Sequence, residues 1–403
     1  MNGNNYNYSP RMSPEKCPVN RRKKKRPLRH KIIIAAVLII YALILGAVTY
    51  FMLYRPDTGG VDTYIEYATD ENGNMIETVH EFTQRDGIYN FLILGEDREA
   101  GLTDVCMVLN FDTASGKIGI LQLPRDTYVR SVDGVNITSG KINELFADHY
   151  RSRQRSGESE DKAYRGALDD VTELLEESLC IKINFSVIMD LDGFRGIVDA
   201  IGGVEMNITS PMVYDDPAQG LYINIPVGYQ TLDGEAAEHF IRFRDDYIQG
   251  DLGRVNAQKM FLSAFFTKLK SCGVSQAANI AGEVFKNVTT DLTLSDTVFF
   301  AKKAVAANLS DITMQTLPGQ VAQTSASHYV MNRAAALKAV NRILNVYENE
   351  ITSGIFDSVG MFNSPGDEYI SSLYYSEEDS LYDGNVYTGD GVADNGIDIP
   401  LKK

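Results

Sequence analysis

Two aspartates and one arginine with the potential for phosphate chemistry lie between Tyr89 and Arg130, each near the end of a short apolar run. Asp97 and Asp104 separate the first two runs, and Arg125 follows the third. Charged groups at the ends of buried strands predict a site at a sheet edge, where α/β proteins bind ligands. Three solvated loop charges are the alternative that this stretch alone leaves open. The runs are Asn90–Leu94, Val105–Phe111 and Ile118–Leu123.

A second charged cluster lies further along the chain. Arg242 and Arg244 are two residues apart, and in extended backbone this spacing places both guanidiniums on one side. Arg254 and Gln258 have the i, i+4 spacing that places them on one face of a helix predicted to begin near Arg254. Surface ion pairs with neighbouring aspartates are the alternative for these arginines.

Together the two clusters predict a site for a diphosphate. Guanidinium groups bind phosphate oxygens through two parallel hydrogen bonds, and the chain offers four of them. Carboxylates such as Asp97 and Asp104 suit Mg²⁺ or Mn²⁺, which shares its remaining positions with substrate phosphates. Such a site stabilises the charge that develops as a P–O bond breaks. Asp251 is a candidate base for an attacking hydroxyl. The four arginines are Arg125, Arg242, Arg244 and Arg254.

The amino-terminal region predicts a membrane anchor. Residues 1–31 contain ten Lys+Arg and one acid, whereas residues 32–54 contain no charge over 23 positions, enough to span a bilayer. Basic residues remain in the cytoplasm, so we expect a single-pass protein of the cell membrane whose remainder is extracellular. That remainder carries 28 bases and 53 acids, which argues against nucleic-acid binding.

Periodicity predicts an α/β fold: a mixed central β-sheet flanked by helices, preceded by one transmembrane helix. We expect a basic disordered tail, the span, a spacer hairpin, a catalytic domain and an acidic, mobile tail. Within the catalytic domain, the polar stretch 151–162 predicts a surface loop. The cysteines predict no disulfide framework, and no zinc, serine-hydrolase or phosphate-loop motif is present. The five segments are residues 1–31, 32–54, 55–88, 89–350 and 351–403.

Seven sequence pieces, in order, resemble the LytR–CpsA–Psr family of bacterial cell-envelope proteins. They are FLILGEDR, TDVCMVLNFD, ILQLPRDTYV, KIN, IGGVEMNI, LDGEAAEHFIRFR and GDLGRVNAQ. The resemblance implies transfer of a glycopolymer from an undecaprenyl-diphosphate carrier to peptidoglycan, with a phosphodiester product. It assigns metal binding to Asp97 and Asp104 and a possible base to Asp251. It assigns binding of the diphosphate to Lys141, Gln258 and the four arginines.

Three positions depart from the family pattern, which leaves the substrate open. Gln122 stands where serine is common, Thr103 where a basic residue is usual, and Ala257 where a second arginine often precedes the glutamine. Two other functions stay open: a pyrophosphatase acting on the same lipid-linked saccharides, and a non-enzymatic lipid-diphosphate receptor or regulator of envelope genes. The sequence names neither the glycopolymer nor the acceptor hydroxyl.

Overall fold

The structure, a computed structural model, describes most of the chain from residue 54 onward. The chain divides into two units after Tyr54, and the described helices and strands belong to the second unit, Arg55–Lys403. For residues 251–256 and 387–388 only the backbone is described. The described residues are 54–58, 60–97, 101–131, 134–217, 220–243, 251–306, 312–358, 361–364, 366–376 and 387–388.

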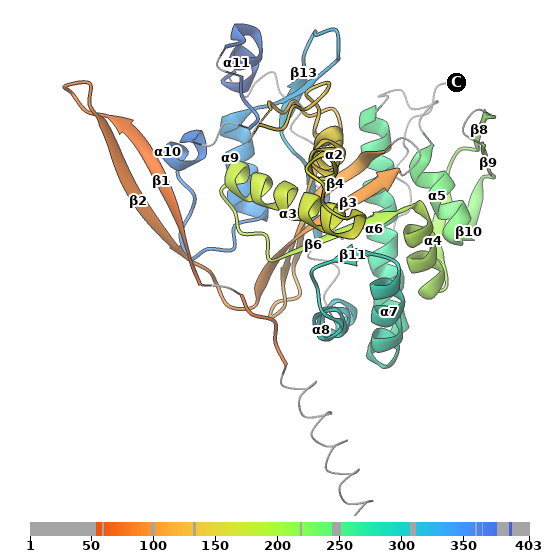
Figure 1. The fold of residues 1–403 in the computed structure, drawn as a ribbon. Helices are drawn as coiled ribbons and strands as arrows, with labels where there is room; N and C mark the ends of the chain where they lie inside the picture. Colours follow the sequence, from red (N-terminus) through yellow and green to blue (C-terminus); the bar gives the residue numbers. More distant parts are fainter. Residues whose placement is uncertain are drawn as a thin grey trace, which may run out of the picture. The chain divides into compact units, whose positions relative to one another are not determined.

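A mixed sheet of seven described strands forms the centre of this unit, in the order β11-β6-β3-β4-β5-β12-β15 (Figure 1). β3 is parallel to β6 and β5 is parallel to β12, whereas β4 is antiparallel to β3 and β5. Four strands therefore end at the same sheet edge, where β4 begins. The strands are β3 Ile88–Asp97, β4 Leu102–Asp112, β5 Ile118–Leu123, β6 Phe185–Asp190, β11 Thr289–Thr290, β12 Ile312–Thr316 and β15 Tyr387–Thr388.

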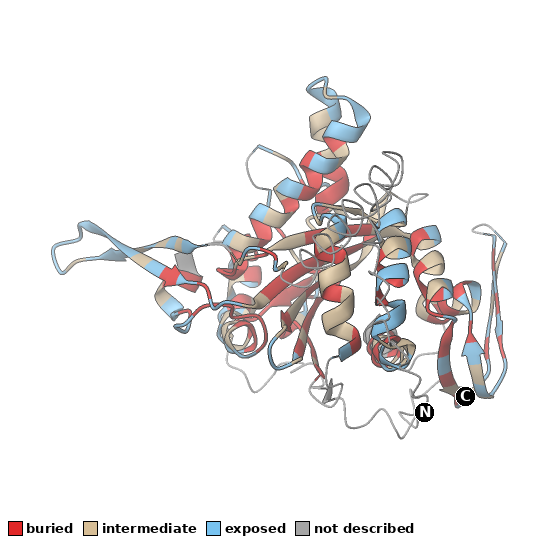
Figure 2. Cartoon of the chain, turned by 90° about the horizontal axis from the view of Figure 1, so that it is seen from below, coloured by how far each residue is buried: buried red, intermediate tan, exposed pale blue. Residues whose placement is uncertain are grey.

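The sheet separates two hydrophobic cores, because successive side chains of a strand point to opposite faces. Leu92 and Leu94 pack in one core, and Phe91 and Ile93 pack in the other. Figure 2 shows the buried residues gathered on the sheet and on the helix sides that cover it. The elements of the first face are η1 Ile142–Glu144, α2 Leu145–Arg155, α3 Glu160–Leu179, α9 Arg333–Ile343, α10 Ser353–Ser358 and α11 Glu368–Tyr374. Those of the second are α4 Leu191–Ala200, α5 Gly234–Arg242, α6 Asp251–Cys272, α7 Val274–Lys286 and α8 Leu294–Ala306.

Four two-stranded sheets complete the described secondary structure. The hairpin predicted within residues 55–88 is confirmed, and at its base Phe82 packs against Tyr347 with ring centroids 5.2 Å apart. Beyond that base the hairpin is mostly exposed (Figure 2). The pairs are β1 Val61–Thr69 with β2 Met75–Thr83, β7 Val204–Ile208 with β10 Gly228–Leu232, β8 Met212–Asp216 with β9 Leu221–Ile225, and β13 Gly319–Val321 with β14 Tyr329–Met331.

Two local predictions are wrong. Most of the polar stretch 151–162 is helical, since α2 extends to Arg155 and α3 begins at Glu160. The mobile tail predicted from residue 351 is instead packed along its described part up to residue 376, because Phe356, Phe362 and Tyr374 are buried in the first core. Seven of its apolar side chains are buried there although the stretch is poor in apolar residues, so the low apolar content misled the prediction; they are Ile351, Ile355, Phe356, Met361, Phe362, Ile370 and Tyr374.

No helix among the described residues has both the length and the apolar character needed to cross a bilayer. The predicted span, residues 32–54, lies outside the described part of the chain apart from Tyr54.

Candidate functional site

A β-bulge marks the start of β4, next to the end of β3. Gly95 pairs with Val105, but the next residue, Glu96, pairs with Thr103, so Asp104 is the extra residue of the bulge. A Cβ at Gly95 would lie 3.0 Å from the Cβ of Val105, so a larger residue would push the two strands apart here. Bulges commonly redirect a side chain beside a functional site. Here the bulge presents Asp104 at the edge where β3 ends with Asp97.

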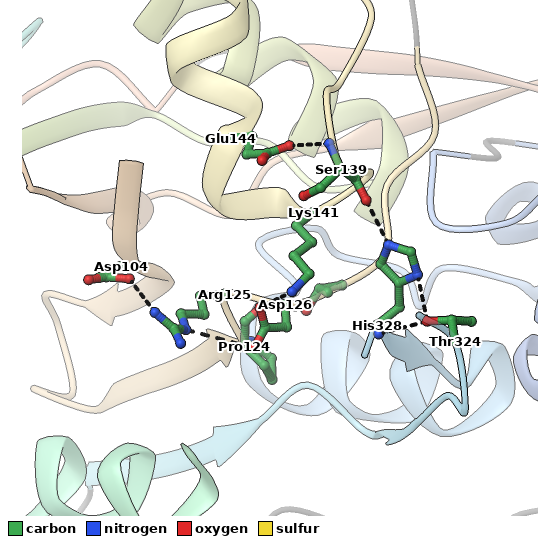
Figure 3. A network of polar contacts seen from close by, with 10 residues as sticks. Asp104, Pro124, Arg125, Asp126, Ser139, Lys141, Glu144, Thr324 and His328 are labelled. Atoms are coloured by element: carbon green, nitrogen blue, oxygen red, sulfur yellow. Dashed lines mark hydrogen bonds and ion pairs between the residues drawn. The ribbon is translucent and has the colours of Figure 1, made fainter. Parts of the chain in front are cut away.

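An ion-pair chain extends from Asp104 across this edge (Figure 3). Nη1 of Arg125 donates to Oδ1 of Asp104 at 3.1 Å, and the Arg125 guanidinium lies 3.7 Å from the carboxylate of Asp126. Nζ of Lys141 donates to Asp126 at 2.8 Å. All four side chains are partly exposed, between 20% and 39%. The structure thus brings together Asp104, Arg125 and Lys141, which the sequence predicted as one site, and adds Asp126.

The loop that carries Lys141 is held by a second set of contacts. Nε2 of His328 lies 2.8 Å from the carbonyl oxygen of Ser139, and Nδ1 lies 3.1 Å from the hydroxyl of Thr324 (Figure 3). A carbonyl oxygen only accepts, so Nε2 carries the proton. The Ser139 amide donates to Glu144 at 2.6 Å. These contacts fix the backbone on the amino-terminal side of Lys141.

The helix α6 approaches the site from the second face of the sheet. Nε2 of Gln122, in β5, donates to Oε1 of Gln258 at 2.6 Å, and both side chains are buried. Gln258 therefore lies beside the end of β5, the strand that Arg125 follows in the sequence. Asp251 and Arg254 belong to the first turns of the same helix, but their side chains lie outside the described structure. The helix begins at Asp251, one turn earlier than predicted.

Arg242 is the last residue of α5, and its Nη1 donates to the buried carboxylate of Glu238 at 2.9 Å. Arg195, from α4, pairs with the same carboxylate. The two helices approach closely because Gly234 has no side chain: a Cβ there would lie 2.6 Å from the Arg195 carbonyl oxygen. The prediction of extended backbone at Arg242 is wrong, because Arg242 is helical. The backbone becomes extended only at Phe243, with ψ 132°. Arg244 lies outside the described residues.

The described residues contain no group of three or more His, Cys, Asp or Glu side chains that would enclose a metal ion. A magnesium ion needs only one or two carboxylates when substrate phosphates and water supply the other ligands. Asp97 and Asp104 at one edge, with Arg125 beside them, fit that mode of binding. The chemistry of this donor set is therefore compatible with Mg²⁺ held jointly by protein and diphosphate.

Two further groups of this region were not predicted. Glu238 precedes Arg242 by four residues, a helical spacing that was available in the sequence. Lys259 follows Gln258 and is 1% exposed, and burial lowers the pKa of its ammonium to about 8. Nothing in the local sequence distinguishes this lysine from a surface lysine, because its burial depends on how α6 packs.

A family model covers most of this chain. Residues 51–345 match the LytR_cpsA_psr family, so the chain belongs to that family. The sequence-based identification is confirmed.

Particular relatives can then be named. The chain is 24% identical over 276 residues to the polyisoprenyl-teichoic acid–peptidoglycan teichoic acid transferase TagV of Bacillus subtilis, covering 66% of this chain and 65% of the relative. It is 27% identical over 261 residues to TagU of Oceanobacillus iheyensis, a transferase of the same description, covering 64% and 75%. Among solved structures, protein gbs0355 of Streptococcus agalactiae aligns with a TM-score of 0.52 and 19% identity over 66% of this chain and 92% of that one. This last similarity supports the α/β fold with a mixed central sheet.

Proposed function

We propose that this protein is a membrane-anchored, extracytoplasmic phosphotransferase. It moves a glycopolymer from an undecaprenyl-diphosphate carrier to peptidoglycan, and its catalytic domain lies outside the cell. The single observation that carries the proposal is the ion-pair chain from Asp104 through Arg125 to Asp126 and Lys141, at the sheet edge where Asp97 ends β3. The two cations, Arg125 and Lys141, and the two proposed metal ligands, Asp97 and Asp104, suit a diphosphate whose charge is shared with Mg²⁺. The named activities of TagV and TagU support the substrate class.

In the proposed reaction, a hydroxyl oxygen of peptidoglycan attacks the sugar-proximal phosphorus. A new P–O bond forms, the bond from that phosphorus to the bridging oxygen breaks, and undecaprenyl phosphate leaves with the electron pair. Asp251 takes the hydroxyl proton. The product is a phosphodiester between glycopolymer and peptidoglycan.

The arginines stabilise the charge on the transferring phosphoryl group. Arg125 is held by Asp104 and Asp126, and Arg242 is held by Glu238, so their guanidiniums are oriented before the substrate binds. Lys141, Arg244, Arg254 and Gln258 complete the proposed diphosphate contacts. When bound by Asp97 and Asp104, Mg²⁺ supplies Lewis-acid stabilisation of the phosphate oxygens.

A reconstituted reaction tests this function. The full chain in lipid nanodiscs is incubated with Mg²⁺, a polyprenyl-diphosphate-linked saccharide and a peptidoglycan oligomer. We expect a covalently joined product, detected by mass spectrometry. A free sugar phosphate without joining would instead indicate a pyrophosphatase, and binding without any product would indicate a receptor; either outcome contradicts the proposed transfer.

The anchor needs its own test, because it decides the compartment of the site. We expect the protein to stay in the membrane fraction after alkaline carbonate washing. Protease added to protoplasts should digest the chain beyond residue 55 and spare the basic tail. Release of a soluble, truncated protein into the medium would contradict the anchor but leave the transfer chemistry standing.

A further inference from the structure

The contact between Gln122 and Gln258 is directional. Gln122 uses its amino group as the donor, and Gln258 uses its carbonyl oxygen as the acceptor. An amide group has an accepting side and a donating side, which face in different directions. With its oxygen turned toward Gln122, Gln258 turns its amino group away from β5. No residue in the described part of the chain accepts a hydrogen bond from that amino group.

A second polar group with unused hydrogen-bonding capacity lies beside this pair. Thr316 pairs with Gln122 in the parallel register of β12 and β5, and both residues share the parity of the side chains that face the second core. The Thr316 hydroxyl is fully buried, and within the described residues it has no hydrogen-bond partner. Buried polar groups are nearly always paired in native proteins. The Thr316 hydroxyl is an exception to this rule, whereas the Gln258 amino group is not fully buried and can donate to a polar ligand.

We propose that Gln122 is a positioning residue that orients the Gln258 amide for diphosphate binding. An anion is attracted by the amino side of an amide and repelled by its carbonyl side, so the direction of the amide decides whether Gln258 helps or hinders. Gln122 fixes the favourable direction through one buried hydrogen bond. This inference rests on the proposed function, since it assigns the accepting ligand as the carrier diphosphate.

The length of the side chain at position 122 decides whether it can reach and orient Gln258. Serine is common at this position in the family that the chain resembles, and its polar atom lies two bonds closer to the backbone than the amide nitrogen of glutamine. It would not span the same separation between β5 and α6. The longer side chain of Gln122 is 4% exposed and reaches Gln258 from the end of β5. It therefore confers a fixed orientation on Gln258 that a shorter residue would leave free.

The test compares diphosphate affinity across matched variants of the full chain in nanodiscs. Gln122→Met keeps the volume and removes the hydrogen bond, and Gln122→Ser provides a second variant should the first fail to fold. Isothermal titration with geranylgeranyl diphosphate and Mg²⁺ should show an affinity about two- to tenfold lower for each, the loss expected when one neutral hydrogen bond is removed. Gln315→Met is the matched control. Gln315 is equally buried but contacts Arg342 on the opposite face, so its diphosphate affinity should match wild type.

A double-mutant cycle separates positioning from a merely structural role. If Gln122 acts through Gln258, Gln122→Met should have no further effect on affinity in a Gln258→Ala background. An equal loss in both backgrounds, or wild-type affinity in folded Gln122 variants, would overturn the inference. Arg125→Ala distinguishes failure of this inference from failure of the proposed function. Diphosphate binding by wild type that Arg125→Ala weakens upholds the diphosphate site on which the proposed function rests, whatever Gln122 does, whereas no binding by wild type rejects both.

Discussion

Asp104 accepts a 3.1 Å hydrogen bond from Arg125 Nη1, which ties a proposed metal ligand to a proposed phosphate ligand. The pair depends on two separate features of the sheet. The bulge places Asp104 outside the regular β3–β4 register, and the end of β5 delivers Arg125 to the same edge. A cation bound by Asp104 competes with Arg125 for the carboxylate oxygens. Metal binding and release of the guanidinium toward a diphosphate are therefore expected to be coupled.

The metal ligands give the first prediction. Asp97→Asn and Asp104→Asn should each abolish the Mg²⁺ dependence of diphosphate binding, because an amide oxygen is a weaker ligand than a carboxylate. The Asp104–Arg125 pair is partly exposed, so Asp104→Asn should lower the free energy of unfolding by less than ~1 kcal/mol. Titration calorimetry with and without EDTA measures the first effect, and urea unfolding measures the second. Asp161→Asn, at an exposed position in α3, is the control, and a large loss of stability would indicate a structural role instead.

Arg125 gives the second prediction. Arg125→Ala should weaken polyprenyl diphosphate binding about ten- to a hundredfold, the equivalent of roughly 1.5–3 kcal/mol for a charge-assisted contact. Arg125→Lys should recover only part of this, since an ammonium group cannot bind two oxygens with a planar fork. Binding of the corresponding monophosphate should suffer much less. Arg165→Ala removes an exposed arginine of α3 as a control, and unchanged diphosphate affinity in Arg125→Ala would reject the assignment.

The parts of the fold and site that the sequence predicted are those set by local patterns. Short apolar runs bounded by turn residues predicted β3, β4 and β5. The charges beside them converged because β3 and β5, both antiparallel to β4, end at the edge where β4 begins. The bulge at Asp104 was not predicted, since the pairing register of two strands is not visible in either one alone. The ion-pair partners of Arg125 and Arg242 were not predicted either, because they depend on tertiary packing. Composition also failed at residues 351–376, where a few well-placed side chains fill the core.

Glu238 gives the third prediction, because one buried carboxylate serves two arginines. Glu238→Leu would leave Arg195 and Arg242 without this partner, and removal of one member of a buried ion pair is strongly destabilising. Both arginines retain some access to water, so we expect a loss of roughly 1–3 kcal/mol in the free energy of unfolding, below the full value for a buried pair. Urea unfolding of the full chain in non-ionic detergent measures it. Glu235→Gln, an exposed change in the same helix, should lie within about 0.5 kcal/mol of wild type; an equally small effect of Glu238→Leu would show that the carboxylate does not hold the arginines.

Lys259 gives the last prediction, a pH-dependent one. Burial lowers the pKa of its ammonium from 10.5 to about 8 in the folded protein. Below pH 8 the lysine is charged in both states, so the full penalty of burying that charge acts, on the order of 3 kcal/mol. Between pH 8 and 10.5 the folded protein releases the proton while the unfolded chain retains it. Stability therefore rises with pH across this window, and above it the penalty is absent.

The stability difference between Lys259→Met and wild type isolates this effect. Other groups also titrate at high pH, among them Cys106, whose pKa is raised to about 12 by burial, but they are common to both proteins and cancel in the difference. We expect Lys259→Met to be the more stable protein at pH 7, and its advantage to shrink steadily as the pH rises from 8 to 10.5. Lys270→Met, at an exposed position on the same helix, should show a difference from wild type that does not change with pH. Urea unfolding at several pH values makes the comparison, and an advantage of Lys259→Met that is constant with pH would mean that Lys259 is not charged at a cost in the folded protein.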